Sequence, residues 1–244
     1  TLRTMVVVGP GYQKIARYKA RIAHRLRIVS KNMRRAFGVS IKLMSVDAWP
    51  IKPSSDDRVL MDNLRRLNDS RSMDLILGFV SGSQTRSKTA GDYKSQYGEF
   101  VILVRSQSPR FERQPDMLHV NEVRAIMAGV GQVFGALPSC NGHVMDPKRL
   151  FAPNAPYTWH PFNYKQIQIH LKAERSDHKR GRFAFPMEVR KKSDDLLATL
   201  ESTHTCPPGL AAVGRRDLLK AIELKDEKRI ISQNLWRQSQ CHGI

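Results

Sequence analysis

The sequence is poor in the residues that crosslink secreted domains or cross membranes. It has only three cysteines, Cys140, Cys206 and Cys241, in 244 residues, and an odd, widely spaced set does not make a disulfide framework. This usage favours a reducing compartment, although one disulfide is compatible with it. No apolar run approaches the ~18 residues of a membrane-spanning helix, so we expect no transmembrane segment. No secretory signal opens the chain, which begins at Thr1, and we expect that a presequence has been removed.

Acidic residues are absent from residues 1–46, which contain eleven lysines and arginines. The whole chain carries 41 Lys and Arg against 22 Asp and Glu, a net charge of +19. Such an excess favours a polyanionic partner, and nucleic acid is the commonest one. An anionic membrane surface is the second reading of this charge, and a merely soluble basic protein is the third.

The apolar patterning predicts an α/β domain followed by a charged extension. We expect a long helix from Ile15 to Phe37, whose apolar residues form one stripe and which Gly38 closes. The other expected strands are 5–8, 39–44, 73–80 (central) and 99–105, and the other expected helices are 56–68, 117–135 and 167–173. We expect a surface loop over 81–98. The composition then divides the chain into a domain of residues 1–173 and a basic, mainly helical extension of residues 174–244, with helices over 187–200 and 215–236.

The long first helix carries basic residues on the face opposite its apolar stripe. A solvated face normally interleaves glutamate with lysine, so an all-basic face suggests phosphate contacts. The candidate RNA-binding residues there are Lys14, Arg17, Arg21, Arg25, Arg27, Arg34 and Arg35. A second candidate cluster contains Lys179, Arg180 and Arg182, with Tyr164, Phe183 and Phe185 nearby to stack on unpaired bases.

One segment has the spacing of a zinc-peptidase active-site helix. Ala128-Gly-Val-Gly-Gln-Val-Phe-Gly-Ala-Leu-Pro138 resembles the metzincin pattern H-E-x-x-H-x-x-G-x-x-H, with its glycine kept as Gly135. The resemblance places Ala128, Gly129, Gln132 and Pro138 where the family has its first His, the Glu, the second His and the third His. Gly142-His-Val-Met-Asp-Pro147 resembles the Met-turn that follows, with Met145 as the floor residue.

Further pieces extend the resemblance to metzincin-like zinc peptidases over roughly residues 4–172. They are Phe37–Ile41, Val46–Trp49, Asp74–Val80 and Phe100–Arg105. The resemblance implies a metzincin-like twisted mixed sheet packed with the long N-terminal helix and a former active-site helix. It also implies an upper strand, residues 99–105, along which an extended peptide could lie by β-augmentation.

The zinc chemistry of that family is missing at every ligand position. A catalytic zinc needs three protein ligands and a base for the bound water, and Ala, Gly and Pro side chains supply neither. We therefore expect no catalytic residue, no bound metal, no cofactor and no small-molecule substrate. A displaced metal site built from His119, Glu122, Cys140 and His143 is the alternative.

These features favour a non-catalytic structural subunit of a large ribonucleoprotein. The best fit is a mitochondrial ribosomal protein of the matrix that contacts rRNA and neighbouring ribosomal proteins. The alternatives are a pseudo-peptidase subunit of a mitochondrial membrane complex, where basic charge meets anionic lipid, and a zinc peptidase with relocated ligands.

Overall fold

The structure is a computed structural model of the chain, and it describes most of the first 198 residues. The described residues are 1–52, 56–70, 73–82, 92–107, 115–137, 144–145, 157–173 and 184–198. They belong to two compact units, which we describe one at a time. Unit 1 comprises Thr1–Ser95, Phe100–Val130 and Leu150–Tyr157, and unit 2 comprises Gln96–Glu99, Gly131–Arg149 and Thr158–Ile244.

Unit 1 is built on a five-stranded mixed sheet with the strand order β2-β1-β3-β5-β4. The strands are β1 (Leu2–Val8), β2 (Ile41–Ala48), β3 (Leu75–Gly82), β4 (Asp92–Ser95) and β5 (Val101–Gln107). All pairs are parallel except β4 with β5, which is antiparallel. The predicted α/β class is confirmed, and β3 is central as its nearly continuous apolar run predicts.

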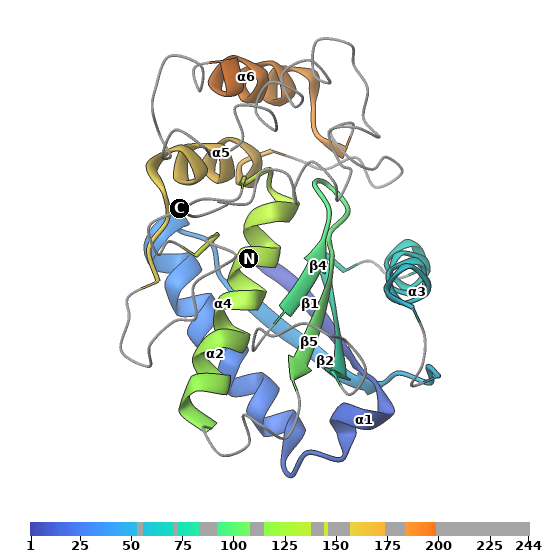
Figure 1. The fold of residues 1–244 in the computed structure, drawn as a ribbon. Coiled ribbons are helices and arrows are strands. Elements are labelled where there is room, and N and C mark those ends of the chain that lie inside the picture. The colour runs from blue at the N-terminus through green and yellow to red at the C-terminus, as the bar shows by residue number, and fades with distance from the viewer. Residues whose placement is uncertain are drawn as a thin grey trace, which may run out of the picture. The chain divides into compact units, whose positions relative to one another are not determined.

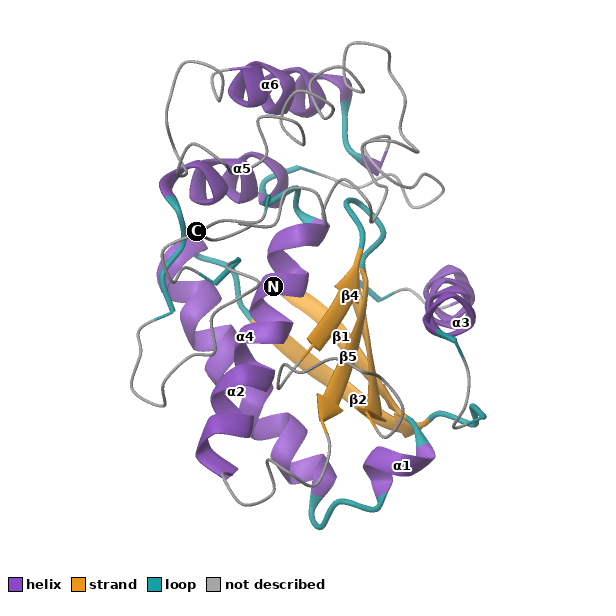
Figure 2. Ribbon diagram, in the orientation of Figure 1, coloured by secondary structure: helices purple, strands orange, loops and turns teal. Residues whose placement is uncertain are grey.

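Helices cover both faces of this sheet (Figures 1 and 2). On one face, α3 (Asp57–Ser70) packs through Leu60, Met61 and Leu64 onto side chains of β1, β3 and β5. Gly78 permits this approach, because a Cβ there would lie 2.7 Å from the Trp49 ring and 2.9 Å from Leu64. On the other face lie α2 (Tyr18–Phe37) and the first part of α4 (Pro115–Val133).

The predicted long first helix is present as one helix that starts three residues later than expected, and a short helix that was not predicted precedes it. A short α1 (Pro10–Gln13) comes first, and α2 begins only at Tyr18 because Arg17 adopts a left-handed conformation with φ of 53°. At the other end Gly38 closes α2 as expected, with φ of 71° and its N–H donating to the Arg34 carbonyl.

One expectation about a loop is wrong, and one predicted helix is present with different bounds. The sequence predicts a loop over 81–98, but these residues contain β4. Consequently β5 is paired on both sides, with β3 and with β4, and it has no open edge for β-augmentation. The helix expected over 167–173 begins earlier, as α5 (Pro161–Leu171), since His160 caps it and Pro161 supplies a favourable first position.

Unit 2 contains α5, α6 (Met187–Ala198) and the last residues of α4. Its core is aromatic: Tyr97 stacks on Phe185 at a ring-centroid distance of 5.5 Å, and His170 meets Phe185 edge to face at 4.5 Å. The expected helix over 187–200 is present as α6, whereas residues 215–236 lie outside the described residues. Within the described ranges, no helix combines the length and apolar character that a membrane span requires.

Candidate nucleic-acid interface and the α4 helix

The exposed face of α2 carries a row of cations. Arg27, Lys31, Arg34 and Arg35 are all exposed and follow each other at steps of four, three and one residues, which places them on one side of the helix. We call these four residues the basic stripe. None of them has an ion-pair partner among the described residues, and the nearest acid in sequence, Asp47, lies beyond the end of the helix.

The other predicted RNA-binding residues are placed less uniformly. Lys14 and Arg17 are exposed and Arg21 is half-buried. The predicted second cluster of Lys179, Arg180 and Arg182 lies outside the described residues. The predicted interface is therefore described only for its first cluster, along the α1–α2 region.

The expectation that Arg25 faces outward with the other basic residues is wrong. Its exposed fraction is only 1%, and its guanidinium forms an ion pair with the carboxylate of Glu122 on α4, which is fully buried. Burial lowers the pKa of Arg25, and the neighbouring Glu122 carboxylate partly opposes this effect. Arg25 is therefore a core residue of unit 1 and is removed from the candidate interface.

Glu122 is the centre of a buried polar cluster. The Ser106 hydroxyl on β5 donates a hydrogen bond of 2.5 Å to Glu122 Oε1, and the Tyr12 hydroxyl on α1 donates one of 3.5 Å to Oε2. Burial raises the pKa of Tyr12, and the Glu122 charge raises it further. The cluster thus connects α1, α2, α4 and β5, and both carboxylate oxygens of Glu122 are engaged.

This cluster also bears on the displaced metal site considered above. Its Glu122 oxygens already accept hydrogen bonds and the Arg25 ion pair, and the His119 ring stacks on His24 at 5.1 Å. Cys140 and His143 lie outside the described residues. Among the residues that are described, no group of three or more His, Cys, Asp or Glu side chains could hold a metal ion.

In unit 1, α4 packs tightly against β5 at the segment that resembles the peptidase motif. Ala128 and Gly129 are both buried. A Cβ added to Gly129 would lie 2.6 Å from Ile102 Cγ2, closer than real side chains approach. The position that the resemblance assigns to the catalytic Glu therefore faces the sheet and has no room for any side chain.

We expect Gly129→Ala to destabilise the protein by about 1–3 kcal/mol through overpacking against Ile102. Helix propensity alone predicts the opposite sign, a gain of about 1 kcal/mol. Urea unfolding monitored by circular dichroism distinguishes the two. The double variant Gly129→Ala, Ile102→Ala should lose less stability than the sum of the single variants, and a stabilised Gly129→Ala would show that the close contact is absent.

In unit 2, the C-terminal end of α4 is held by a glycine cap. Gly135 has φ of 81°, its N–H donates to the Gln132 carbonyl, and the Ala136 N–H donates to the Gly131 carbonyl. This is a Schellman motif, so the glycine shared with the peptidase pattern ends the helix here. The Asn163 side chain then holds the following residue, donating to the Leu137 carbonyl at 2.7 Å and accepting from its N–H at 2.8 Å.

The remaining motif positions in unit 2 are buried as well. Gln132 is 7% exposed and Met145 is 3% exposed. A Cβ on Gly131 would lie 2.7 Å from the Trp159 ring and 3.1 Å from Met145 Sδ, so Met145 packs directly beside this glycine. Pro138 lies outside the described residues. The described motif positions of unit 2 are therefore buried and closely packed, as those of unit 1 are.

Comparison with known proteins gives a likeness of fold only. No known protein family and no curated protein matches the sequence. Among solved structures, an archaemetzincin from Methanopyrus kandleri is 16% identical, with 82% of this chain and 96% of that chain covered and a TM-score of 0.41. A zinc-dependent peptidase from Methanocorpusculum labreanum is 15% identical, with 78% and 99% covered and a TM-score of 0.36. A chaperone-substrate complex is 11% identical, with 58% and 23% covered and a TM-score of 0.39.

Proposed function

We propose that this chain is a non-catalytic, RNA-binding structural subunit of a large ribonucleoprotein, with a mitochondrial ribosome as the host complex. The observation that carries the proposal is the basic stripe, four exposed cations on one side of α2 without an ion-pair partner among the described residues. From Arg27 to Arg35 the stripe extends for about 12 Å at the helical rise of about 1.5 Å per residue. A row of this kind suits consecutive phosphates of a nucleic-acid backbone.

The burial of the opposite face of α2 favours RNA over a membrane surface. Ile22, Leu26, Val29 and Met33 are at most 2% exposed, because they pack in the core of unit 1. A helix that binds a bilayer places its apolar face between the lipid chains, and α2 has no such face to offer. Contacts through charge alone are sufficient for phosphate binding.

Replacing the basic stripe should weaken RNA binding and its dependence on salt. For the variant Arg27→Gln, Lys31→Gln, Arg34→Gln, Arg35→Gln we expect the slope of log Kobs against log salt to become less negative by about 3, at about 0.7–0.9 per lost phosphate contact. The measurement is fluorescence anisotropy with a labelled rRNA fragment over a salt series.

The matched control for the stripe variant carries the same change in net charge elsewhere on unit 1. Lys42, Lys52, Arg58 and Arg66 are also exposed, and the two arginines lie on α3, which covers the opposite face of the sheet. Their replacement by Gln should leave the slope nearly unchanged. An equal loss in both variants would show that net charge, and not the stripe, attracts the RNA.

The close packing of α4 supports the non-catalytic part of the proposal. Gly129 has no room for a side chain, and Gly131 and Met145 pack against each other in unit 2. These are features of a retained packing element. Metal analysis of the purified protein tests this part separately: about one zinc per chain would favour the relocated-ligand peptidase.

The host complex is tested on the native protein. Sedimentation of a mitochondrial lysate at moderate salt should place the chain with rRNA and ribosomal proteins, and high salt should release it because exposed charge contacts are screened. Recovery of the chain with mitochondrial membranes at low salt, in place of ribosomal particles, would favour the membrane-complex alternative.

A further inference from the structure

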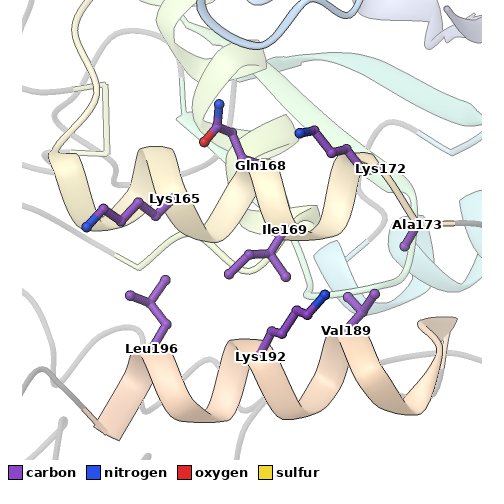
Figure 3. A pocket seen from close by; sticks show the side chains of 8 residues that line it. All are labelled: Lys165, Gln168, Ile169, Lys172, Ala173, Val189, Lys192 and Leu196. Atoms are coloured by element: carbon purple, nitrogen blue, oxygen red, sulfur yellow. The ribbon is translucent and has the colours of Figure 1, made fainter.

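A groove with a basic rim lies between α5 and α6 in unit 2 (Figure 3). Its volume is about 500 Å³. Ile169 points from α5 toward α6, and Val189 and Leu196 point from α6 toward α5, so the floor is aliphatic. Lys165, Gln168, Lys172, Ala173 and Lys192 complete the lining.

The groove follows the repeat of both helices for two turns. The lining residues of α5 and the segment after it are 165, 168, 169, 172 and 173, and those of α6 are 189, 192 and 196. With this spacing of three and four residues the lining residues extend for about 10 Å along each helix, and the channel between the helices follows them. Such a channel has the form in which one further helix lays its apolar face.

The charge of the groove has one sign. Lys165, Lys172 and Lys192 are all exposed, and no acid is among its lining residues. Lys165 on α5 and Lys172, the residue directly after α5, are seven residues apart, and Lys192 lies on α6, so lysines contribute to the lining from both sides of the groove. We infer that the groove docks an acidic amphipathic helix of a partner protein, whose apolar residues contact Ile169, Val189 and Leu196 and whose carboxylates meet the three lysines.

The lining favours this partner over RNA. Unpaired bases are bound by stacking on aromatic rings or arginine planes, and the eight lining residues include neither. An aliphatic floor instead gains from burying leucine-type side chains. The inference concerns unit 2 and does not depend on RNA binding by the basic stripe of α2.

The test uses the full chain and a labelled synthetic helix that has leucines at i, i+3, i+4 and i+7 and glutamates on both flanks. We expect saturable binding by fluorescence anisotropy. Charge reversal in Lys165→Glu, Lys172→Glu, Lys192→Glu should weaken binding at least about tenfold. The matched control is Lys42→Glu, Lys52→Glu, Lys191→Glu, which makes the same change in net charge at three exposed lysines that do not line the groove. It should bind the probe as the unchanged protein does.

Three results would overturn the inference. The first is equal binding of a probe whose glutamates are replaced by lysines. The second is loss of binding of an RNA oligonucleotide, rather than of the peptide, in the triple variant. The third comes from a photo-crosslinking residue placed at Gln168 in the full chain: crosslinks to residues 199–244 in the absence of the probe would show that this chain covers its own groove. Crosslinking to the acidic probe alone supports the inference.

Discussion

Glu122→Gln is expected to lower the free energy of unfolding by about 3–5 kcal/mol. The substitution leaves the Arg25 guanidinium, which is 1% exposed, without its counter-charge in the core of unit 1. A buried ion pair contributes little net stability as a whole, but removing one partner exposes the full desolvation cost of the other. The loss should be large for this reason and not because the pair is itself strongly stabilising.

The same argument predicts a contrasting result for the double variant. Arg25→Met with Glu122→Leu replaces both charges by apolar side chains of similar length, and its stability should lie near that of the unchanged protein or above it. The Ser106 and Tyr12 hydroxyls then lose a shared acceptor, which limits the gain.

Urea unfolding of Arg25→Met, Glu122→Leu and the double variant closes a double-mutant cycle, and Glu122→Gln is measured beside it. The matched control is the exposed pair of α3, in which Arg65 contacts Asp62 and the aspartate side chain is 58% exposed. Asp62→Asn should cost less than about 1 kcal/mol. A Glu122→Gln loss as small as that of Asp62→Asn would contradict the buried pair.

The sequence predicts the parallel core of the sheet well and its edge poorly. β1, β3 and β5 each contain a short, nearly continuous apolar run, residues 5–8, 75–80 and 101–104, that is buried on both faces. Such runs can be recognised in the sequence without knowledge of tertiary contacts. β4 is four residues long and lies in a stretch rich in Ser, Gly and Lys. Its pairing with β5 is a tertiary contact that short, polar sequence does not reveal.

The helix patterns likewise predict which face is buried but not every residue in it. Arg25 lies three residues after Ile22 and four before Val29, both of which belong to the apolar stripe of α2. Helical spacing therefore puts it at the border of the core, and only the presence of an acid in the apolar helix α4 points to its partner. α4 contains two acids, Asp116 near its start and Glu122 in its middle, and the structure shows that Glu122 is the partner.

For the glycines of the peptidase-like segment, too, the sequence gives the positions and only the structure shows the roles. A pattern match locates Gly129, Gly131 and Gly135, but their roles differ. The first two allow close approach to Ile102 and Trp159, and the third ends the helix. Close approach depends on the opposing element, so it becomes visible only in the structure.

Acidification from pH 6.5 to about 4 is expected to destabilise unit 2 through His170. This side chain is fully buried, and burial lowers its pKa from 6.5 to about 4. The hydrogen bonds explain why the neutral ring fits. Nδ1 donates to the Gln166 carbonyl at 2.8 Å, since a carbonyl only accepts, and Nε2 accepts from the Tyr97 hydroxyl at 2.6 Å.

The sign of the effect follows from proton binding. Below pH 6.5 the unfolded chain takes up a proton on His170 that the folded unit does not bind until about pH 4, so stability falls as the pH falls through this window. The difference of about 2.5 pH units corresponds to a loss of about 3.5 kcal/mol, at about 1.4 kcal/mol per unit. Above pH 6.5 the ring is neutral in both states and contributes no pH dependence.

The measurement is urea unfolding at closely spaced pH values, compared between the unchanged protein and His170→Gln. Glutamine offers a donor and an acceptor but does not titrate, so the part of the slope due to His170 should disappear between pH 4 and 6.5 even where the variant is less stable at neutral pH. His24→Gln is the matched control, because His24 is exposed on α2. If His24→Gln flattens the profile and His170→Gln does not, the buried ring is not the group that makes the fold sensitive to acid.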